Sequence, residues 1–570
     1  MTETEFDRSN GIDGGEAVVA ALEAAGVSHI FCASGSEWAP VWEALARRHR
    51  DGVASPRYLD LLHETVAAGM ATGYGLVTRR PSGVLLHAGP GLLQGAMAIH
   101  GALLAGVPLV ALSSESITYG DGPGADPGGQ WYRNLSHVGG PHTIAAPFTK
   151  WANQVGAVSV LLGMVTRSVE MSQRAPAGPV YLNVPVEVLL DPWTPPERIV
   201  PAPVPGGSVS SSSDIEAVVA LLRTARRPVI VTETVGREAG GLEALVEFAE
   251  AFSIPVVEPS SAVCTNFPRT HPLHAGADLS TFLDDADVIV LVNCRAPFYP
   301  PSSVPSNATV VVVDEVPQRP HVVYQVLNAS HYLEGGVPGT LRAAAALGRE
   351  TQKDPVRVDL AVSAGAKEAS AVATAEESAA AKPGIDPVAL AVALRELLAA
   401  EDSVVVDETI THAGALRRHL RRDEPDSYFY VQGGLGQGMA VALGVKLASP
   451  EKTVAFTVGD GAFLYNPIVQ SLQASKDFGL PLLIVVFNNH RYKSMQMNHL
   501  RFYPDGAAVE TGEWLGVDLS GQPELSDLVA PFGFHGEAVA SRDELRLALE
   551  RALKSVREGV TALVNVSVIR

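Results

Sequence analysis

Short apolar runs alternate with helical patterns in three separate segments of the chain. The first segment, residues 11–190, opens with the helical pattern GEAVVAALEAAG and continues with the runs HIFCASG, GVLLHAG and PLVALSS. Comparable alternation occupies residues 205–350 and residues 389–570. Such alternation is typical of parallel sheets whose strands are joined by helices. The sequence therefore predicts an α/β fold with three doubly wound parallel-sheet domains.

Two stretches between these segments have the composition of linkers. PAPVPGGSVSSSSD, at 201–214, is rich in Pro, Gly and Ser. SAGAKEASAVATAEESAAAKPGID, within residues 351–388, is rich in Ala, Ser and Glu and contains no aromatic residue. This composition predicts an exposed linker that holds a helical turn or two.

The charge balance argues against two classes of partner. The chain has 42 Lys and Arg residues against 62 Asp and Glu, a formal net charge of −20, which disfavours nonspecific binding to nucleic acid or to an anionic membrane. No uninterrupted apolar run is long enough to span a bilayer. Three widely spaced cysteines, Cys32, Cys264 and Cys294, form neither a disulfide framework nor a zinc site. With a polar N-terminus unlike a signal peptide, these features predict a cytoplasmic protein.

The stretch AFTVGDGAFLYN, residues 455–466, places Asp460 at the end of an apolar run. A buried carboxylate costs several kcal/mol unless a partner such as a cation compensates it. Gly459 and Gly461 on either side have no Cβ, so a bulky anionic group could approach the backbone closely. The stretch predicts a binding site at Asp460, although the letters GDG alone also occur in ordinary turns.

The residues after Asp460 supply a second element of this predicted site. Asn466 and Pro467 are expected to open a helix as its N-cap and first-turn residues. The next apolar run ends on Asn488 and Asn489. If the two strands are neighbours, Asp460 and Asn489 both emerge at the carboxyl edge, where open α/β sheets bind ligands. Carboxylate and amide oxygens suit Mg²⁺ or Ca²⁺, and Mg²⁺ keeps positions for phosphate oxygens, so we expect a diphosphate here.

The GDG and NN motifs, with 26 residues between them, resemble the cofactor motif of thiamine diphosphate enzymes, in which the spacing is slightly shorter. The resemblance implies that Mg²⁺ is held by the Asp460 carboxylate, the Asn489 side chain and the backbone carbonyl of Arg491. It also implies that the cofactor is contacted by Gly459, Gly461 and Tyr492. On this reading residues 11–190 are the pyrimidine-binding domain, 205–350 the middle domain and 389–570 the diphosphate-binding domain.

Three further stretches resemble segments of the same family. RYLDLLHETVAAGMATGYGL, at 57–76, resembles the helix whose glutamate contacts the aminopyrimidine ring, which implies this role for Glu64. QGGLGQGMAVALG, at 432–444, resembles the segment that holds the cofactor bent, with Leu435 between the two rings and the Gly433 carbonyl accepting from the 4′-amino group. Thr411, after the run VVVDET, is a candidate donor to the diphosphate. Taken alone, Gly434, Gly436 and Gly438 of the QGGLGQGMAVALG stretch could be half of a dinucleotide-binding fingerprint, but no strand closely precedes them.

Within this family the chain resembles the acetolactate synthase and 2-oxo acid decarboxylase group, and several stretches resemble benzoylformate decarboxylase. FCASGSEWAPVW carries Ser36 at the position of a substrate-contacting serine, and LLHAGPGLLQGAM carries His87 at the position of an active-site histidine. Ser36 and His87 are therefore implied as catalytic residues beside Glu64. His87 could exchange a proton near neutral pH, or it could be a satisfied core histidine.

The sequence departs from that pattern, which puts an aromatic substrate in question. A second active-site histidine, expected near CRAPFYPPS, is replaced by Phe298, Tyr299 and Pro300. After the Asn pair, more apolar contacts with a phenyl group would be expected where the chain has Ser494, Met495 and Asn498. The segment GGQWYRNLSHVGGPH matches no family pattern, and it either lines a specialised pocket or forms a packed loop with Trp131, Tyr132, Arg133 and His137.

The resemblance implies a lyase or carboligase that depends on thiamine diphosphate and Mg²⁺ and acts on a 2-oxo acid or an aldehyde. Loss of CO₂ would leave an enamine, whose protonation gives an aldehyde and whose attack on a second carbonyl gives an acyloin or acetohydroxy acid. The alternatives are an acetolactate synthase-like carboligase, a homologue that binds the cofactor without catalysis, and a nicotinamide oxidoreductase built on the glycines. In the family, active sites form between chains, which implies a homodimer or homotetramer.

Overall fold

A computed structural model describes residues 11–569, apart from 122–125, 130–134, 138, 202, 296, 299–304, 306, 320–321, 323–324, 326–327 and 350–354. The chain forms two compact units. The first comprises the chain up to Pro205 together with Val431–Glu451 and Leu464–Leu480, and the second comprises Gly206–Tyr430, Lys452–Phe463 and Pro481–Arg570. Two parts of the third segment of the sequence thus belong to the first unit. The three-domain boundaries expected from the sequence stay a prediction.

Six parallel strands from the first segment form one sheet in the order β2-β1-β3-β4-β6-β5. Its strands are β1 (His29–Ala33), β2 (Arg57–Leu61), β3 (Ser82–Leu85), β4 (Leu109–Ser113), β5 (Trp151–Gln154) and β6 (Val180–Asn183). The helices of this segment are α1 (Gly14–Ala24), α2 (Ala39–Arg50), α3 (Glu64–Thr78), α4 (Pro90–Ala105), α5 (Pro141–Ala145), α6 (Val158–Gln173) and α7 (Val186–Leu190). The strand order reverses between β1 and β3, so a crevice is expected beyond their carboxyl ends.

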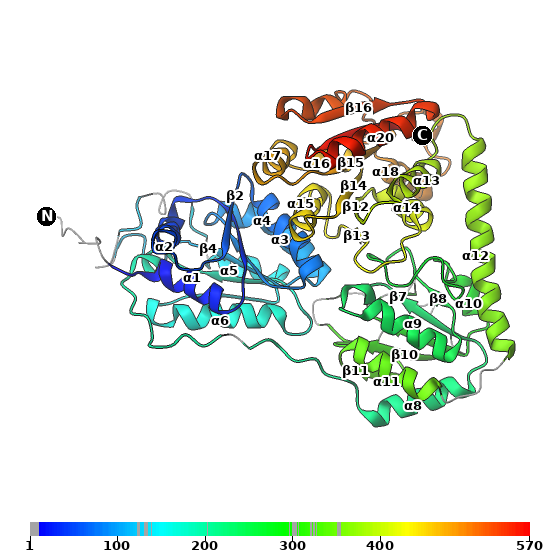
Figure 1. Ribbon diagram of the computed structural model, residues 1–570, viewed down its shortest axis with the longest axis horizontal. Coiled ribbons are helices and arrows are strands. Elements are labelled where there is room, and N and C mark those ends of the chain that lie inside the picture. The colour runs from blue at the N-terminus through cyan, green and yellow to red at the C-terminus, as the bar shows by residue number, and fades with distance from the viewer. Residues whose placement is uncertain are drawn as a thin grey trace, which may run out of the picture. The chain divides into compact units, whose positions relative to one another are not determined.

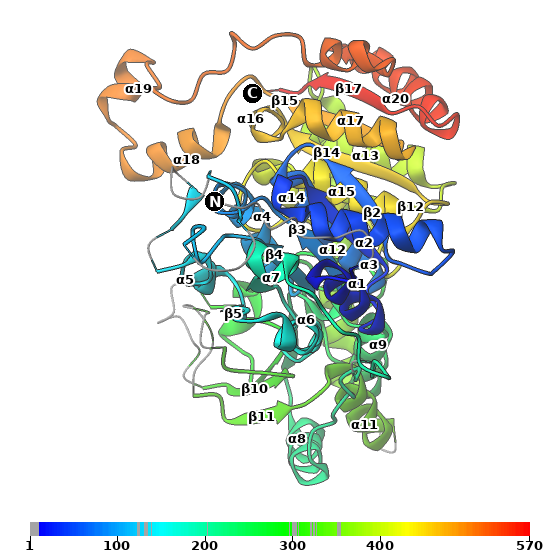
Figure 2. The same ribbon diagram turned by 90° about the vertical axis from the view of Figure 1, so that its left-hand side faces the viewer.

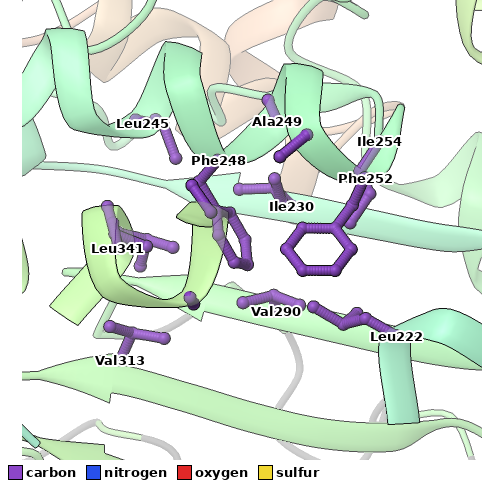
Figure 3. Packing of buried hydrophobic residues seen from close by; sticks show 14 of the residues in the cluster. Leu222, Ile230, Leu245, Phe248, Ala249, Phe252, Ile254, Val290, Val313 and Leu341 are labelled. Atoms are coloured by element: carbon purple, nitrogen blue, oxygen red, sulfur yellow. The ribbon is translucent and has the colours of Figure 1, made fainter. Parts of the chain in front are cut away.

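Five parallel strands form the middle sheet in the order β11-β10-β9-β7-β8. They are β7 (Pro228–Thr232), β8 (Val256–Val257), β9 (Val288–Val292), β10 (Thr309–Asp314) and β11 (His331–Glu334). The helices are α8 (Ser212–Thr224), α9 (Gly241–Phe252), α10 (Ser280–Leu283) and α11 (Val337–Arg349). Figure 3 shows Phe248 and Phe252 of α9 packed with Ile230, Val290 and Leu341. Each fully buried side chain of this size contributes about 1.5–3 kcal/mol.

Six parallel strands from the third segment form a sheet in the order β13-β12-β14-β15-β17-β16. They are β12 (Ser403–Glu408), β13 (Tyr428–Tyr430), β14 (Thr453–Gly459), β15 (Leu483–Asn488), β16 (His535–Val539) and β17 (Ala562–Ser567). The helices are α13 (Pro387–Leu398), α14 (Ala413–Leu420), α15 (Gly438–Ala448), α16 (Asp460–Tyr465), α17 (Ile468–Phe478), α18 (Lys493–Phe502), α19 (Ala507–Thr511) and α20 (Arg542–Arg557). This order repeats that of the first sheet, and the three parallel sheets, coloured along the chain in Figure 1, confirm the predicted fold class.

The stretch expected to be an exposed linker is instead the 27-residue helix α12 (Pro355–Ala381), drawn as one unbroken helix in Figure 1. Its alanines favour a helix, and its acidic side chains find basic partners on other helices. Glu368 forms a bidentate pair with Arg418 of α14, at 2.7 and 2.8 Å, and Glu376 pairs with Arg395 of α13 at 2.7 Å. The sequence reading was therefore wrong about the length of helix in this stretch, because composition alone does not show these partners.

The helix after Asp460 also begins differently from the sequence prediction. Asp460 opens the short helix α16, and α17 begins only at Ile468. The side chain of Asn466 does not cap α17, because its Oδ1 accepts a hydrogen bond from the backbone N–H of Met439 at 3.1 Å. The N-cap prediction for Asn466 was wrong. Among the described residues, no helix is both long and apolar enough to cross a membrane.

Candidate active site

Asp460 lies at the reversal point of the C-terminal sheet. Strand β14 pairs in parallel with both β12 and β15, and Gly459 is opposite Phe487 in the β15 register. This confirms that the two strands are neighbours. Asp460 is 2% exposed, and its Oδ2 is buried with no hydrogen-bond partner among the described residues. Burial raises the pKa of Asp460, and the backbone N–H groups of Gly461 and His490 oppose that rise.

The strand end beside Asp460 supplies neutral oxygen donors. Asn489 is buried, and its Oδ1 accepts from the backbone N–H of Arg491 at 3.0 Å. The backbone N–H of His490, with φ +57°, faces the Asp460 carboxylate, so the turn that carries Asn489 reaches Asp460. A buried carboxylate oxygen without a hydrogen-bond partner fits a hard cation. Among the described residues there is no cluster of three or more His, Cys, Asp or Glu that could hold a metal.

Three residues expected to contact the cofactor, Thr411, Gly461 and Tyr492, follow the adjacent strands β12, β14 and β15. Thr411 lies half-buried in a short 3₁₀ turn (Ile410–His412) directly after β12. Ile410 in that turn has φ +48°, a costly conformation for a β-branched residue that is most often found at functional sites. The space beside Gly461 is taken by the ring of Tyr492, because a Cβ there would lie 2.3 Å from it. Gly461 is therefore explained by the packing of Tyr492.

Glu64 begins helix α3 in the first unit, and the close packing of α3 on α15 fixes its position. A Cβ on Gly73 would lie 2.0 Å from the Val441 carbonyl oxygen, and one on Gly444 would lie 2.0 Å from that of Met70. The small residues that follow Glu64 thus let two helix backbones touch. The Glu64 carboxylate lies against the first turn of α4, where its Oε1 is 3.0 Å from the position of a Cβ on Gly91.

His87 follows β3 and pairs with a glutamate that sequence analysis did not single out. Its Nδ1 lies 2.8 Å from Oε1 of Glu37, which is fully buried and also accepts from the backbone N–H of Ala88 at 2.7 Å. This hydrogen bond raises the pKa of His87, burial opposes it, and the charges of Glu37 and Glu64 add to the rise. Ser36 is exposed, one residue from Glu37, in the turn that touches the His87 ring.

His137 lies against Gly89, in the turn that joins His87 to helix α4. Its backbone N–H and its Nδ1 bind the two carboxylate oxygens of Glu115, at 2.9 and 3.0 Å, and a Cβ on Gly89 would lie 2.3 Å from its ring. Two histidines that each contact a buried glutamate, His87 and His137, therefore lie at the turn before α4, and Glu64 contacts the start of that helix. The other members of that sequence cluster, Trp131, Tyr132 and Arg133, lie outside the described residues.

The glycine-rich segment packs on α4 within the first unit. A Cβ on Gly433 would lie 2.7 Å from Cα of Gly101, and one on Gly434 would lie 3.2 Å from Sδ of Met97. Leu435, which follows these two glycines, is half-buried. The side chain of Gln437 donates to the carbonyl oxygens of Gln432 and Gly434, at 3.0 and 3.3 Å, which holds the segment in a tight loop.

The residues that mark departures from the family pattern are placed only in part. Phe298 is buried in a core cluster of the middle segment, and Tyr299 and Pro300 lie outside the described residues. Ser494, Met495 and Asn498 lie on α18, which with α19 is orange in Figure 2, and neither helix has a buried residue.

Comparison with protein families and curated proteins gives consistent matches. Three domain models of thiamine pyrophosphate enzymes match: the N-terminal TPP binding domain at residues 12–136, the central domain at 215–329 and the C-terminal TPP binding domain at 410–566. Benzoylformate decarboxylase of Pseudomonas aeruginosa is 26% identical over 526 residues, 88% of this chain and 90% of that protein. Acetolactate synthase of Bacillus subtilis is 25% identical over 562 residues, 95% of this chain and 91% of that protein.

Solved structures of similar fold cover nearly the whole chain. A thiamine diphosphate-dependent 4-hydroxybenzoylformate decarboxylase from Rhodococcus jostii RHA1 superposes with a TM-score of 0.79 at 23% identity, covering 98% of this chain and 99% of that one. Benzoylformate decarboxylase from Polynucleobacter necessarius gives a TM-score of 0.78 at 20% identity, with 98% of each chain covered. At these identities the superpositions establish the fold.

Proposed function

The chain belongs to the thiamine pyrophosphate enzyme family, within the branch of 2-oxo acid decarboxylases and carboligases, and from this premise we propose that it is a lyase that removes CO₂ from a 2-oxo acid. The observation that carries the proposal is the constellation at one turn of the first unit. Glu64 and His87, which contacts Glu37, both lie beside Gly91. A histidine close to a carboxylate can act as the general acid that transfers a proton to a carbanion.

In this proposal thiamine diphosphate, when bound, supplies the nucleophilic carbon and the electron sink for decarboxylation. Glu64 would share a proton with the aminopyrimidine nitrogen. His87, with its Nδ1 fixed by Glu37, would deliver a proton from Nε2 to the carbon that has lost CO₂. Ser36, exposed in the turn that touches His87, would contact the substrate.

The proposal assigns Mg²⁺ to Asp460, Asn489 and the Arg491 carbonyl. The unpartnered Oδ2 of Asp460 supports this assignment, because a buried carboxylate oxygen is costly without a cation or a donor. The diphosphate and the bent cofactor would be contacted by Thr411, Gly433, Leu435, Gly459, Gly461 and Tyr492.

A second candidate function is a carboligase that passes the decarboxylated fragment to another carbonyl. The similarity to acetolactate synthase over 95% of this chain favours it. The choice depends on whether a second carbonyl compound reaches the site before a proton does. The proposal also includes a homodimer or homotetramer with active sites between chains, which sedimentation velocity would test, and a cytoplasmic location.

The decisive experiment measures CO₂ release from a panel of aliphatic and aromatic 2-oxo acids with thiamine diphosphate and Mg²⁺ present. Glu64→Gln is assayed beside the wild type, and the products are identified by mass with and without an added aldehyde. CO₂ release that is lost in Glu64→Gln supports the lyase proposal. An aldehyde product then indicates protonation, and an acyloin product indicates carboligation. If the cofactor binds and no acid releases CO₂, the decarboxylase proposal is wrong, and ligation or cleavage without CO₂ replaces it. A Glu64→Gln variant as active as the wild type would contradict the role of Glu64.

A further inference from the structure

His412 is a buried histidine beside the strand end that carries Asn489. It ends the 3₁₀ turn after β12, is 6% exposed, and its ring stacks on that of Phe487 with centroids 5.9 Å apart. Its Nε2 lies 3.4 Å from the amide nitrogen of Asn489, which is also buried. The two residues are 77 positions apart in the sequence, and nothing in the motif pattern pointed to this contact.

The contact with Asn489 makes Nε2 of His412 a hydrogen-bond acceptor. The amide of Asn489 has one donor group, its Nδ2, and one acceptor, its Oδ1. Because Nδ2 can only donate, the atom 3.4 Å away, Nε2 of His412, accepts from it. This contact and the hydrogen bond from the Arg491 N–H to Oδ1 both favour the same orientation of the amide.

This orientation matters because the two ends of an amide are opposite in polarity. With Nδ2 held by His412, Oδ1 points away from the ring, where it accepts from the Arg491 N–H and keeps a second lone pair. The reversed amide would present its N–H groups where a cation is expected. Groups that orient a metal ligand without touching the metal typically contribute 10–100-fold to affinity.

We propose that His412 is a positioning residue for the metal site: its Nε2 accepts from the Asn489 amide N–H, so that the amide oxygen faces the cation beside Asp460. The inference rests on the cofactor site in the proposed function. It adds a residue that lies outside the GDG and NN motifs. Through His412, the turn that carries Thr411 contacts the metal ligand Asn489. His412 itself does not bind the metal.

The test measures Mn²⁺ binding to the full-length protein with thiamine diphosphate, using the electron paramagnetic resonance signal of free Mn²⁺. Mn²⁺ is a spin-visible substitute for Mg²⁺, so the readout does not depend on turnover. His412→Phe keeps the ring, its burial and its stacking on Phe487 but removes the acceptor. His412→Gln keeps an acceptor oxygen. His499→Phe, on the exposed face of α18, is the matched control.

We expect about 10–100-fold weaker Mn²⁺ binding by His412→Phe, with His412→Gln close to the wild type and His499→Phe unchanged. Equal affinity of His412→Phe and wild type would overturn the inference and leave the proposed function intact. Equal loss in His412→Phe and His412→Gln would also overturn it, because the acceptor would then not be what matters. If the wild type binds no Mn²⁺ with the cofactor present, the metal site of the proposed function itself fails, and the inference fails with it.

Discussion

A buried glutamate faces a histidine in two regions of this protein, and the two pairs differ in access to water. In the first unit, Glu37 holds Nδ1 of His87 at 2.8 Å, and the histidine side chain is 28% exposed. In the middle segment, Glu258 lies 3.2 Å from Nε2 of His274, which is only 4% exposed, and Arg269 lies 3.1 Å from the same carboxylate oxygen. The first pair can exchange a proton with its surroundings, whereas the second is enclosed by the fold.

The pKa shifts of the two histidines have opposite signs. The hydrogen bond that His87 donates to Glu37 raises the pKa of His87, whereas burial and the charge of Arg269 lower that of His274. Burial alone would raise the pKa of Glu258, but Arg269 and His274 outweigh it and lower the value to about 2. The same two residue types therefore form a partly exposed pair at one sheet and an enclosed ion network at another. The difference comes from the added charge of Arg269 and from the deeper burial of the second pair.

The largest expected effect is on catalysis and separates the two histidines. His87→Ala should slow CO₂ release by about 10²–10⁴-fold, the usual contribution of a general acid or base. The measurement is kcat on the best 2-oxo acid, with His274→Gln as the control. If His87→Ala had the wild-type kcat, the His87 pair would not be catalytic. If His274→Gln lost as much kcat per folded molecule as His87→Ala, the His274 pair would not be purely structural.

The next effect is on stability and concerns the enclosed network. Glu258→Gln leaves the Arg269 charge buried without its partner, which should cost about 3–5 kcal/mol. Because the pKa of Glu258 is about 2, Glu258 is ionised throughout neutral pH, and the cost should be the same between about pH 6 and pH 9. Calorimetric unfolding at several pH values measures it. A cost that varied over this range would show that the network titrates.

The smallest effect is expected at the accessible pair, and it should depend on pH. A raised histidine pKa contributes stability below the unfolded value of about 6.5, and this contribution is lost as the pH rises through the folded value. Glu37→Gln should therefore cost about 1.5–3 kcal/mol at low pH and less at high pH. The same calorimetric series, with Glu258→Gln as the reference of constant cost, measures this. A cost that grew with pH would contradict the raised pKa of His87.

Much of the candidate site could be read from short motifs, because each lies at a strand end and strand ends follow from periodicity. Asp460 and Asn489 were expected at neighbouring strand ends, and β14 and β15 are indeed adjacent. Glu64 was expected on a helix and begins α3. The partners of these residues could not be read in the same way. Glu37 and His87 are 50 positions apart, and His137 and Glu115 are 22 apart, with no pattern that joins them.

Two predictions failed for the same kind of reason. The Ala-rich stretch was read as a linker because it is rich in Ala, Ser and Glu and has no aromatic residue, whereas in the fold its charged side chains pair with Arg418 and Arg395. Asn466 was read as a helix cap because of the proline that follows, whereas its side chain binds the backbone of Met439. In both cases a contact distant in the sequence replaced the local preference.

The sequence by itself determined the three parallel α/β sheets, the family and the residues at the strand ends, because alternating apolar runs and short motifs are local properties of the chain. The tertiary structure decided which groups face those residues: Glu37 beside His87, His412 beside Asn489, and the unpartnered carboxylate oxygen of Asp460. Protonation and amide orientation depend on neighbours within a few ångströms, and strand order and burial bring such neighbours together from distant parts of the sequence.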